Sequence, residues 1–543
     1  MYERAPDQPS CRAPSAVGVD PRGHKVKGMA ARSPSSSGAA REPLGREVWI
    51  VSAVVVIGVI MSILDTTIVN VALETLSREL DAPLNTIQWV ATGYLLALAT
   101  VIPLTGWMTE RFGSKRIWMI SVSLFGVGSA LCGLAWSAES LIFFRVLQGF
   151  GGGMIMPVGM ALLAQTAGPA RVGRVMSVIG VPMLLGPILG PVLGGLIVDT
   201  VSWRWIFYVN VPIACFALVL AAKLLKLDAG RADAGRLDWL GLLLLSPGLG
   251  LFVFGLSESE SHGGFADPVV WGPMVAGVAL VALFTRHSLR ADRPLIDVRM
   301  FRRRTFSAAA STTFLVGAAL FGAMIILPLY YQVARGESAL TAGLLMAPQG
   351  LGAALAMPLA GRLTDTLGGG RVALAGLTVL TLGTIPFAFL DGSTSYTLLA
   401  VLLVVRGLGI GASMMPAMAA AYSTLQASEV PRATSSLNAL QRIGGSIGTA
   451  VLAVVLQGEI KDQLSPAQVG ESAPAAAGTL ERLPEDLRSR LAEPLAAAFA
   501  STFWWAVGIS LLALIPATIL ALSQRRERGN EAAALAEPEQ QVA

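Results

Sequence analysis

Residues 48–73 read VWIVSAVVVIGVIMSILDTTIVNVAL, and this stretch decides how the rest of the chain is interpreted. A helix needs about 20 apolar residues to cross a bilayer, so the run is long enough to span one. Its one charged residue is Asp65. A carboxylate in the middle of a spanning helix costs about 2.5–3.5 kcal/mol on insertion scales and is commonly functional. We expect Asp65 to face a water-filled space and exchange protons; the alternative is a buried structural acid.

The composition is that of a polytopic, all-α membrane protein. Of the 543 residues, 54% are hydrophobic and 14% are charged, against about 25% charged in a typical soluble domain. Counting apolar windows predicts about fourteen transmembrane helices. The expected spans are 48–72, 86–108, 117–136, 139–165, 173–197, 204–225, 239–257, 269–287, 305–332, 340–362, 372–391, 395–423, 433–457 and 497–522.

Several classes of function are disfavoured. The net charge is +5, but the basic residues lie in short loops, which indicates membrane orientation rather than nucleic-acid binding. The three cysteines form no CxxC pair, the three histidines lie outside the apolar segments, and no P-loop is present. The sequence also shows no single site with a pair of acids or with a nucleophile beside a base, which are the patterns typical of catalytic sites. We therefore expect no enzyme, no metal, no cofactor and no ATP.

Basic residues alternate with acidic ones from loop to loop. The loop after the first span is acidic, and the loop after the second span is basic. The positive-inside rule then places both termini in the cytoplasm of a multi-pass cell-membrane protein. The basic positions are Arg111, Lys115 and Arg116 after the second span, Arg290, Arg293, Arg299, Arg302, Arg303 and Arg304 after the eighth, and Arg525, Arg526 and Arg528 in the tail.

The two ends of the chain repeat each other at a near-constant offset. Glycine and acid positions in 106–113 recur in 361–368, Arg145 recurs at Arg406, and Arg174 recurs at Arg432. Eight expected spans separate equivalent helices, which is an even number, so the repeats are parallel. Such folds place the substrate between two bundles near the midplane, and rocking of the bundles gives alternating access.

The domain organisation follows from the repeat. We expect a disordered cytoplasmic tail (1–46), an N-terminal six-helix bundle (47–228), two inserted transmembrane helices (236–290), a basic cytoplasmic linker (291–304), a C-terminal six-helix bundle (305–523) with an external loop (458–495), and a cytoplasmic C-terminal tail (524–543).

The loop after the second span is a candidate conformational latch between helices. Its acid and its turn glycine recur in the second copy, which favours a latch over a plain positive-inside anchor. The residues proposed for the latch are Gly106, Glu110, Arg111, Gly113, Arg116 and Asp365.

Arg145 is the expected partner of Asp65. It lies about seven residues into its span, which is about 10 Å deep, and Asp65 lies at a similar depth from the same side. An opposite charge favours the ionised carboxylate and burial disfavours it, so the two residues could control when a proton is held. The alternative is a static ion pair that fixes helix packing.

The loop at Gly106–Arg116 resembles the signature loop of the major facilitator superfamily, although the family usually has Asp where this chain has Glu110. In that family the Arg145-x-x-Gln148-Gly149 pattern is associated with proton coupling. The fifth span resembles the antiporter motif of facilitator exporters, which implies export. The motif positions are Gly186, Pro187, Gly190, Pro191, Gly194 and Gly195.

Stretches at 203–212, 330–332, 342–348 and 438–445 are similar to the fourteen-helix drug:proton antiporter branch of that family. The branch typically has proline where this chain has Glu74, so we expect the first helix to be unkinked. The resemblance implies a proton-coupled antiporter that exports drugs or other toxic lipophilic compounds, with small organic molecules, protons and the lipid bilayer as partners.

Polar residues in the spans are candidate liners of the substrate cavity. They are Asn70, Gln148, Gln332, Gln349, Asn438, Gln441 and Arg442, and the aromatic candidates are Trp89, Tyr94, Phe314, Phe321 and Tyr330. A mostly apolar cavity with one or two acids would suit bulky lipophilic, often cationic, compounds. Two other functions stay open: a dedicated exporter of one endogenous metabolite, such as an antibiotic, siderophore or amino acid, and a non-transporting membrane receptor or scaffold of the same fold.

Overall fold

The computed structural model describes residues 45–168, 171–175, 186, 189–190, 193–198, 200–226, 230, 235–261, 264–423, 425–426, 429–463 and 485–540. Regular structure in these residues is helical throughout. The predicted N-terminal tail and the middle of the predicted external loop lie almost entirely outside them.

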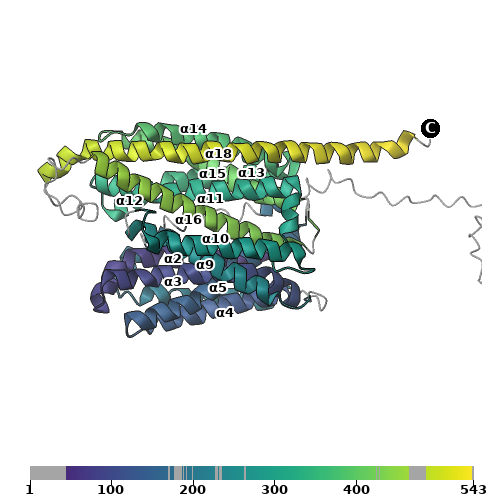
Figure 1. Ribbon diagram of the computed structural model, residues 1–543, viewed down its shortest axis with the longest axis horizontal. Helices are drawn as coiled ribbons and strands as arrows, with labels where there is room; N and C mark the ends of the chain where they lie inside the picture. Colours follow the sequence, from purple (N-terminus) through teal and green to yellow (C-terminus); the bar gives the residue numbers. More distant parts are fainter. Residues whose placement is uncertain are drawn as a thin grey trace, which may run out of the picture.

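The N-terminal half is a helical bundle (Figure 1). Its elements are α2 (Arg46–Glu79), α3 (Leu84–Phe112), α4 (Ser114–Gly133), α5 (Ala138–Ala167), α7 (Trp205–Tyr208) and α8 (Asn210–Leu224). Gly113, at φ 89°, makes the sharp turn between α3 and α4, a conformation that favours glycine. A Ser137–Ser140 capping box starts α5. As expected from Glu74, α2 continues without interruption to Glu79.

The C-terminal half repeats the bundle. Its elements are α11 (Arg304–Leu329), η3 (Tyr330–Ala334), α12 (Ala339–Leu345), α13 (Ala347–Leu367), α14 (Gly369–Thr384), η4 (Ile385–Phe389), α15 (Tyr396–Tyr422), α16 (Val430–Gln463) and α18 (Glu485–Gln540). Both α16 and α18 continue into the loop predicted at 458–495, and α18 continues past the predicted bundle end at 523. Ala, Glu and Arg, which favour helix, dominate the C-terminal extension.

The inserted pair, α9 (Trp239–Ser261) and α10 (Pro268–Arg290), lies across the seam between the halves (Figure 1). The α9 helix packs on both α3 and α16. An apolar cluster joins Ile102 of α3, Leu249 of α9, Phe284 of α10 and Ala439 of α16. The short helix η2 (Val298–Arg302) then leads into the C-terminal half.

Thirteen helices within the described residues are long and apolar enough to cross a membrane. They match the predicted spans one for one except the fifth, at 173–197, most of which lies outside the described residues. The prediction of an all-α polytopic membrane protein is confirmed.

The two halves share a core at only one end of the described helices. We call this the basic end, because it carries Arg111, Lys115, Arg116 and the arginines of 290–304. One cluster there contains Met160 and Leu162 of the first half together with Met418 and Leu437 of the second. At the opposite end each half has its own cluster, around Val69 and Phe207 in the first and around Tyr330 and Phe387 in the second.

The packing of α11 against α16 depends on glycine. A Cβ atom at Gly317 would lie 2.6 Å from the Gln441 carbonyl oxygen. We expect Gly317→Val to destabilise the protein by about 1–3 kcal/mol, because overpacking forces the helices apart. The check is thermal denaturation in detergent, followed by fluorescence size exclusion. Gly508→Val, at an exposed position with nothing within 4 Å of the added Cβ, is the control. Equal stability of the two variants would contradict the packing account.

Candidate functional site

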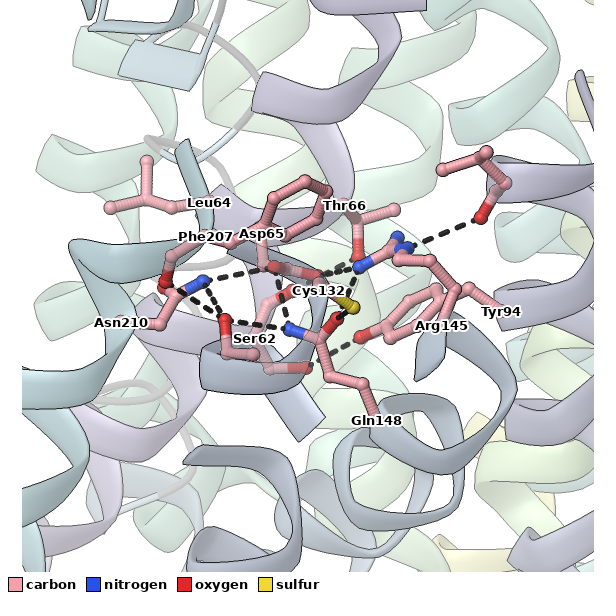
Figure 2. Close-up of polar contacts among 12 residues, drawn as sticks. Ser62, Leu64, Asp65, Thr66, Tyr94, Cys132, Arg145, Gln148, Phe207 and Asn210 are labelled. Carbon is pink, nitrogen blue, oxygen red and sulfur yellow. Dashed lines mark hydrogen bonds and ion pairs between the residues drawn. The ribbon is translucent and has the colours of Figure 1, made fainter. Parts of the chain in front are cut away.

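Asp65 lies in the middle of α2 and is fully buried, at 0% exposure. Its Oδ2 atom accepts a bond of 2.6 Å from Nη1 of Arg145, which lies on α5 and is 1% exposed. Figure 2 shows the two side chains pointing toward each other between the helices of the first half. The structure thus brings together the two residues that the sequence analysis paired.

Two amides complete the shell of Asp65 (Figure 2). Its Oδ1 atom accepts from Nε2 of Gln148 at 2.8 Å and from Nδ2 of Asn210 at 2.9 Å. The Ser129 hydroxyl accepts from the same amides, at 3.1 and 3.0 Å, and donates to the Phe207 carbonyl. An ionised carboxylate only accepts hydrogen bonds, so this set of donors fits the charged form of Asp65.

The guanidinium of Arg145 is fixed from several sides. Its Nε donates to the Val90 carbonyl at 3.1 Å, and Nη1 donates to Oε1 of Gln148 at 2.7 Å as well as to Asp65. The charge lies 4.0 Å from the centre of the Tyr94 ring, which adds a cation–π contact. Glycine permits this closeness: a Cβ at Gly128 would lie 2.7 Å from the Cα atom of Gln148.

The arrangement is strongly dependent on charge. Removing one partner of a buried ion pair typically costs about 3–5 kcal/mol, because the other charge is left uncompensated. Protonation of Asp65 removes its charge in the same way and leaves Arg145 without a counter-ion. The site can therefore convert the gain of one proton into a large local change in free energy.

Sequence reasoning found part of this network. Gln148, expected as a cavity liner, is instead buried in the network and bonded to Asp65 and Arg145. Ser129 and Asn210 were missed. The available signal was Asn210 itself, an amide inside the quoted 203–212 stretch and next to an apolar run.

The acids of the latch motif make ion pairs between the two halves. Glu110 of α3 accepts from Nη2 of Arg432 on α16 at 2.8 Å. Asp365 of α13 accepts from Nε of Arg174 at 2.7 Å and from the Gly173 amide at 3.0 Å. Each acid therefore pairs with the arginine of the other repeat.

The remaining latch residues have different surroundings. A Cβ at Gly106 would lie 3.0 Å from the Cα atom of Arg432, so glycine allows the close contact of α3 with α16. Gly113 makes the turn after α3. Arg111 and Arg116 are exposed at the basic end.

The described glycines of the predicted antiporter motif pack mainly on α2. Cβ atoms at Gly186, Gly190 and Gly194 would contact Ile63, Thr67 and Ile68, respectively, whereas one at Gly195 would have nothing within 4 Å. The Thr67 hydroxyl donates to the Gly186 carbonyl at 3.3 Å. This stretch thus lies against the helix that carries Asp65. Pro187 and Pro191 lie outside the described residues.

The predicted cavity liners do not form one group. Gln332 donates to the Pro328 carbonyl of its own turn, Asn438 contacts Met160 of α5, and Gln441 contacts Met414 of α15. Arg442 is partly exposed. The side chain of Asn70 lies outside the described part of the chain. No cluster of His, Cys, Asp and Glu that could hold a metal occurs among the described residues.

Comparisons with known proteins agree with this architecture. The chain is 41% identical to a Mycobacterium tuberculosis protein named "Multidrug resistance protein B homolog", over 88% of this chain and 91% of the relative. It is 32% identical to the "Multidrug export protein EmrB" of Haemophilus influenzae, over 72% and 77%. Its fold is similar to the human organic anion transporter MFSD10 (TM-score 0.57, 16% identity, 87% of this chain and 100% of that one).

The profile of the Major Facilitator Superfamily matches residues 55–449. The resemblance noted in the sequence is confirmed, and with it the assignment to a family of transporters rather than enzymes. The chain belongs to the major facilitator superfamily, and its relatives within it are multidrug resistance exporters.

Proposed function

We propose that this chain exports drugs or other lipophilic organic compounds across the cell membrane in exchange for protons. The observation that carries the proposal is the buried Asp65–Arg145 pair, with an ion-pair distance of 2.6 Å, in the interior of a transporter. The names of the relatives, which refer to multidrug resistance and multidrug export, support the substrate class.

The basic end is the cytoplasmic end in this proposal, because membrane proteins retain Lys and Arg on that side. Both termini are then cytoplasmic. The halves meet at that end through the Glu110–Arg432 and Arg174–Asp365 pairs. The described arrangement is therefore closed toward the cytoplasm, and the two pairs act as latches that must open before substrate enters.

Asp65 couples the proton to this motion. A proton that arrives from outside neutralises the carboxylate and releases Arg145 and the two amides from it. The first half then repacks, the latches open, and the proton leaves to the cytoplasm as substrate binds. Rocking of two parallel repeats is the established motion of such folds.

The first prediction concerns proton exchange. In everted vesicles with a preformed proton gradient, several unrelated lipophilic compounds should cause proton efflux, followed with a pH-sensitive dye. Asp65→Asn should abolish the efflux at equal protein level, because the amide cannot take up a proton. Asp267→Asn, which changes the partly exposed N-cap of α10, is the control and should behave as wild type.

Other outcomes are informative. Efflux with one compound only would favour a dedicated exporter. A fully active Asp65→Asn variant would show that the carboxylate is structural and that the proton is carried elsewhere.

The second prediction concerns the latches. Glu110→Gln or Arg432→Gln should favour opening at the basic end by about 1–2 kcal/mol, a factor of roughly 5–30 in population. A cysteine introduced at the buried Ser435, which contacts Thr105 of α3, should then react faster with a permeant maleimide. The measurement uses a background in which the three native cysteines are replaced.

Glu47→Gln is the matched control, because Glu47 makes an exposed ion pair with Lys226 within one half. Its labelling rate should equal that of the parent. Unchanged labelling in both latch variants would contradict the proposed role of the pair.

A further inference from the structure

One face of α16 is directed at the first half of the protein. Ser435 shares a hydrogen bond of 2.6 Å with Thr105 of α3, and Asn438 contacts Met160 of α5. Arg442 lies one turn beyond Asn438 and two turns beyond Ser435, so the three side chains lie on the same face of the helix.

The α16 helix is enclosed by other helices. It packs against α3, α5, α9, α11 and α18, and no residue from Val430 to Leu456 is exposed. Arg442 is nevertheless only partly buried. It follows Arg432 by ten positions, which is about 15 Å along the helix from the basic end. Arg442 therefore keeps some accessible surface on a helix that is enclosed by its neighbours.

Arg442 has no hydrogen bond and no carboxylate partner among the described residues. It lies within electrostatic range of Tyr94, whose ring is 4.0 Å from the guanidinium of Arg145. Tyr94 thus lies near both the proton site and Arg442. Arginine stays charged in proteins, so Arg442 is a cation without a counter-ion in the described chain.

A second arginine adds to the excess of positive charge. Arg406, the repeat of Arg145, is 1% exposed and donates only to the neutral Gln349 and Thr384, at 3.1 and 3.3 Å. The middle of the spans thus contains Arg145, Arg406 and Arg442 against the single carboxylate of Asp65. The undescribed residues of 176–198 contain no acid in the sequence.

We propose that Arg442 binds the negatively charged group of the substrate, and that the preferred substrates are lipophilic organic anions such as carboxylates with an apolar body. The inference rests on the proposed function of export and names its substrate class. A buried charge is stable only when paired, and among the described residues a bound anion is the group that would complete Arg442. The apolar body would contact the surrounding bundle, as in most small-molecule sites.

This substrate class makes the exchange more strongly electrogenic. Outward movement of one anion and inward movement of one proton both transfer positive charge inward. The membrane potential, negative inside, would therefore drive the export of an anion more strongly than that of a neutral compound.

The test compares one fluorescent probe in two charge states. Dansyl-labelled undecanoic acid and its methyl ester are titrated at pH 7.5 against the purified full-length protein. We expect Arg442→Gln to weaken binding of the acid at least about tenfold, because it removes one partner of a buried charge pair, and to leave binding of the ester unchanged. The affinity of each probe is compared between wild type and variant in the same detergent, so the fraction of probe that enters detergent micelles affects both values equally.

Two further variants complete the design. Arg442→Lys keeps the charge and should retain much of the preference for the acid; it also serves if Arg442→Gln does not fold. Arg371→Gln removes an exposed arginine at the basic end and should change neither affinity.

The inference is overturned if Arg442→Gln weakens both probes equally or neither of them. Because binding is measured at equilibrium without a gradient, this result is independent of proton coupling. The protein could export neutral compounds in exchange for protons while Arg442→Gln leaves binding of the acid unchanged. That result would support the proposed function and contradict only the anion site. If Arg442→Gln weakens binding of the acid alone but the protein shows no proton-coupled export, the anion site stands and the proposed function is contradicted.

Discussion

An ion pair buried between helices is the constraint on which the rest of the structure depends. Asp65 and Arg145 are both essentially unexposed, and neither charge is stable there alone. The chain therefore supplies Gln148, Asn210 and the Val90 carbonyl around the pair. Glycines on α4 and α5 let the helices approach closely enough for these contacts. Much of the first bundle is thus arranged around one carboxylate and the groups that donate hydrogen bonds to it.

The same physical logic operates between the halves, but at shallower positions. Glu110, Arg432 and Arg174 are partly exposed, whereas the side chain of Asp365 is 2% exposed. Contact with water makes both pairs weaker than the Asp65–Arg145 pair and easier to open. In each pair the acid comes from one half and the arginine from the other. The two halves therefore make equivalent contacts at the basic end. In the cycle that we propose, the interior pair responds to a proton and the peripheral pairs open reversibly, which are the two parts that alternating access requires.

The sequence was sufficient for the thirteen spans that the structure describes and for the Asp65–Arg145 pair, because long apolar runs and charges within them are strong signals. It was not sufficient for Ser129 or Asn210. Serine and asparagine are common in helices, and their role here depends on the rotation of α4 and α8 relative to α2. The partners of Glu110 and Asp365 also could not be assigned, since they lie in the other half of the chain, 322 and 191 residues away. Gln441, predicted as a cavity liner, contacts Met414 because the packing of α16 turns it toward α15.

The central claim is that Asp65 exchanges one proton as substrate binds. The most direct measurement is the number of protons released when substrate is added to the purified protein in weakly buffered detergent solution. At an acidic pH at which Asp65 is protonated before substrate is added, the account predicts release of about one proton per molecule from wild type, the number that one carboxyl group can lose, and none from Asp65→Asn. Equal release from both proteins would contradict it.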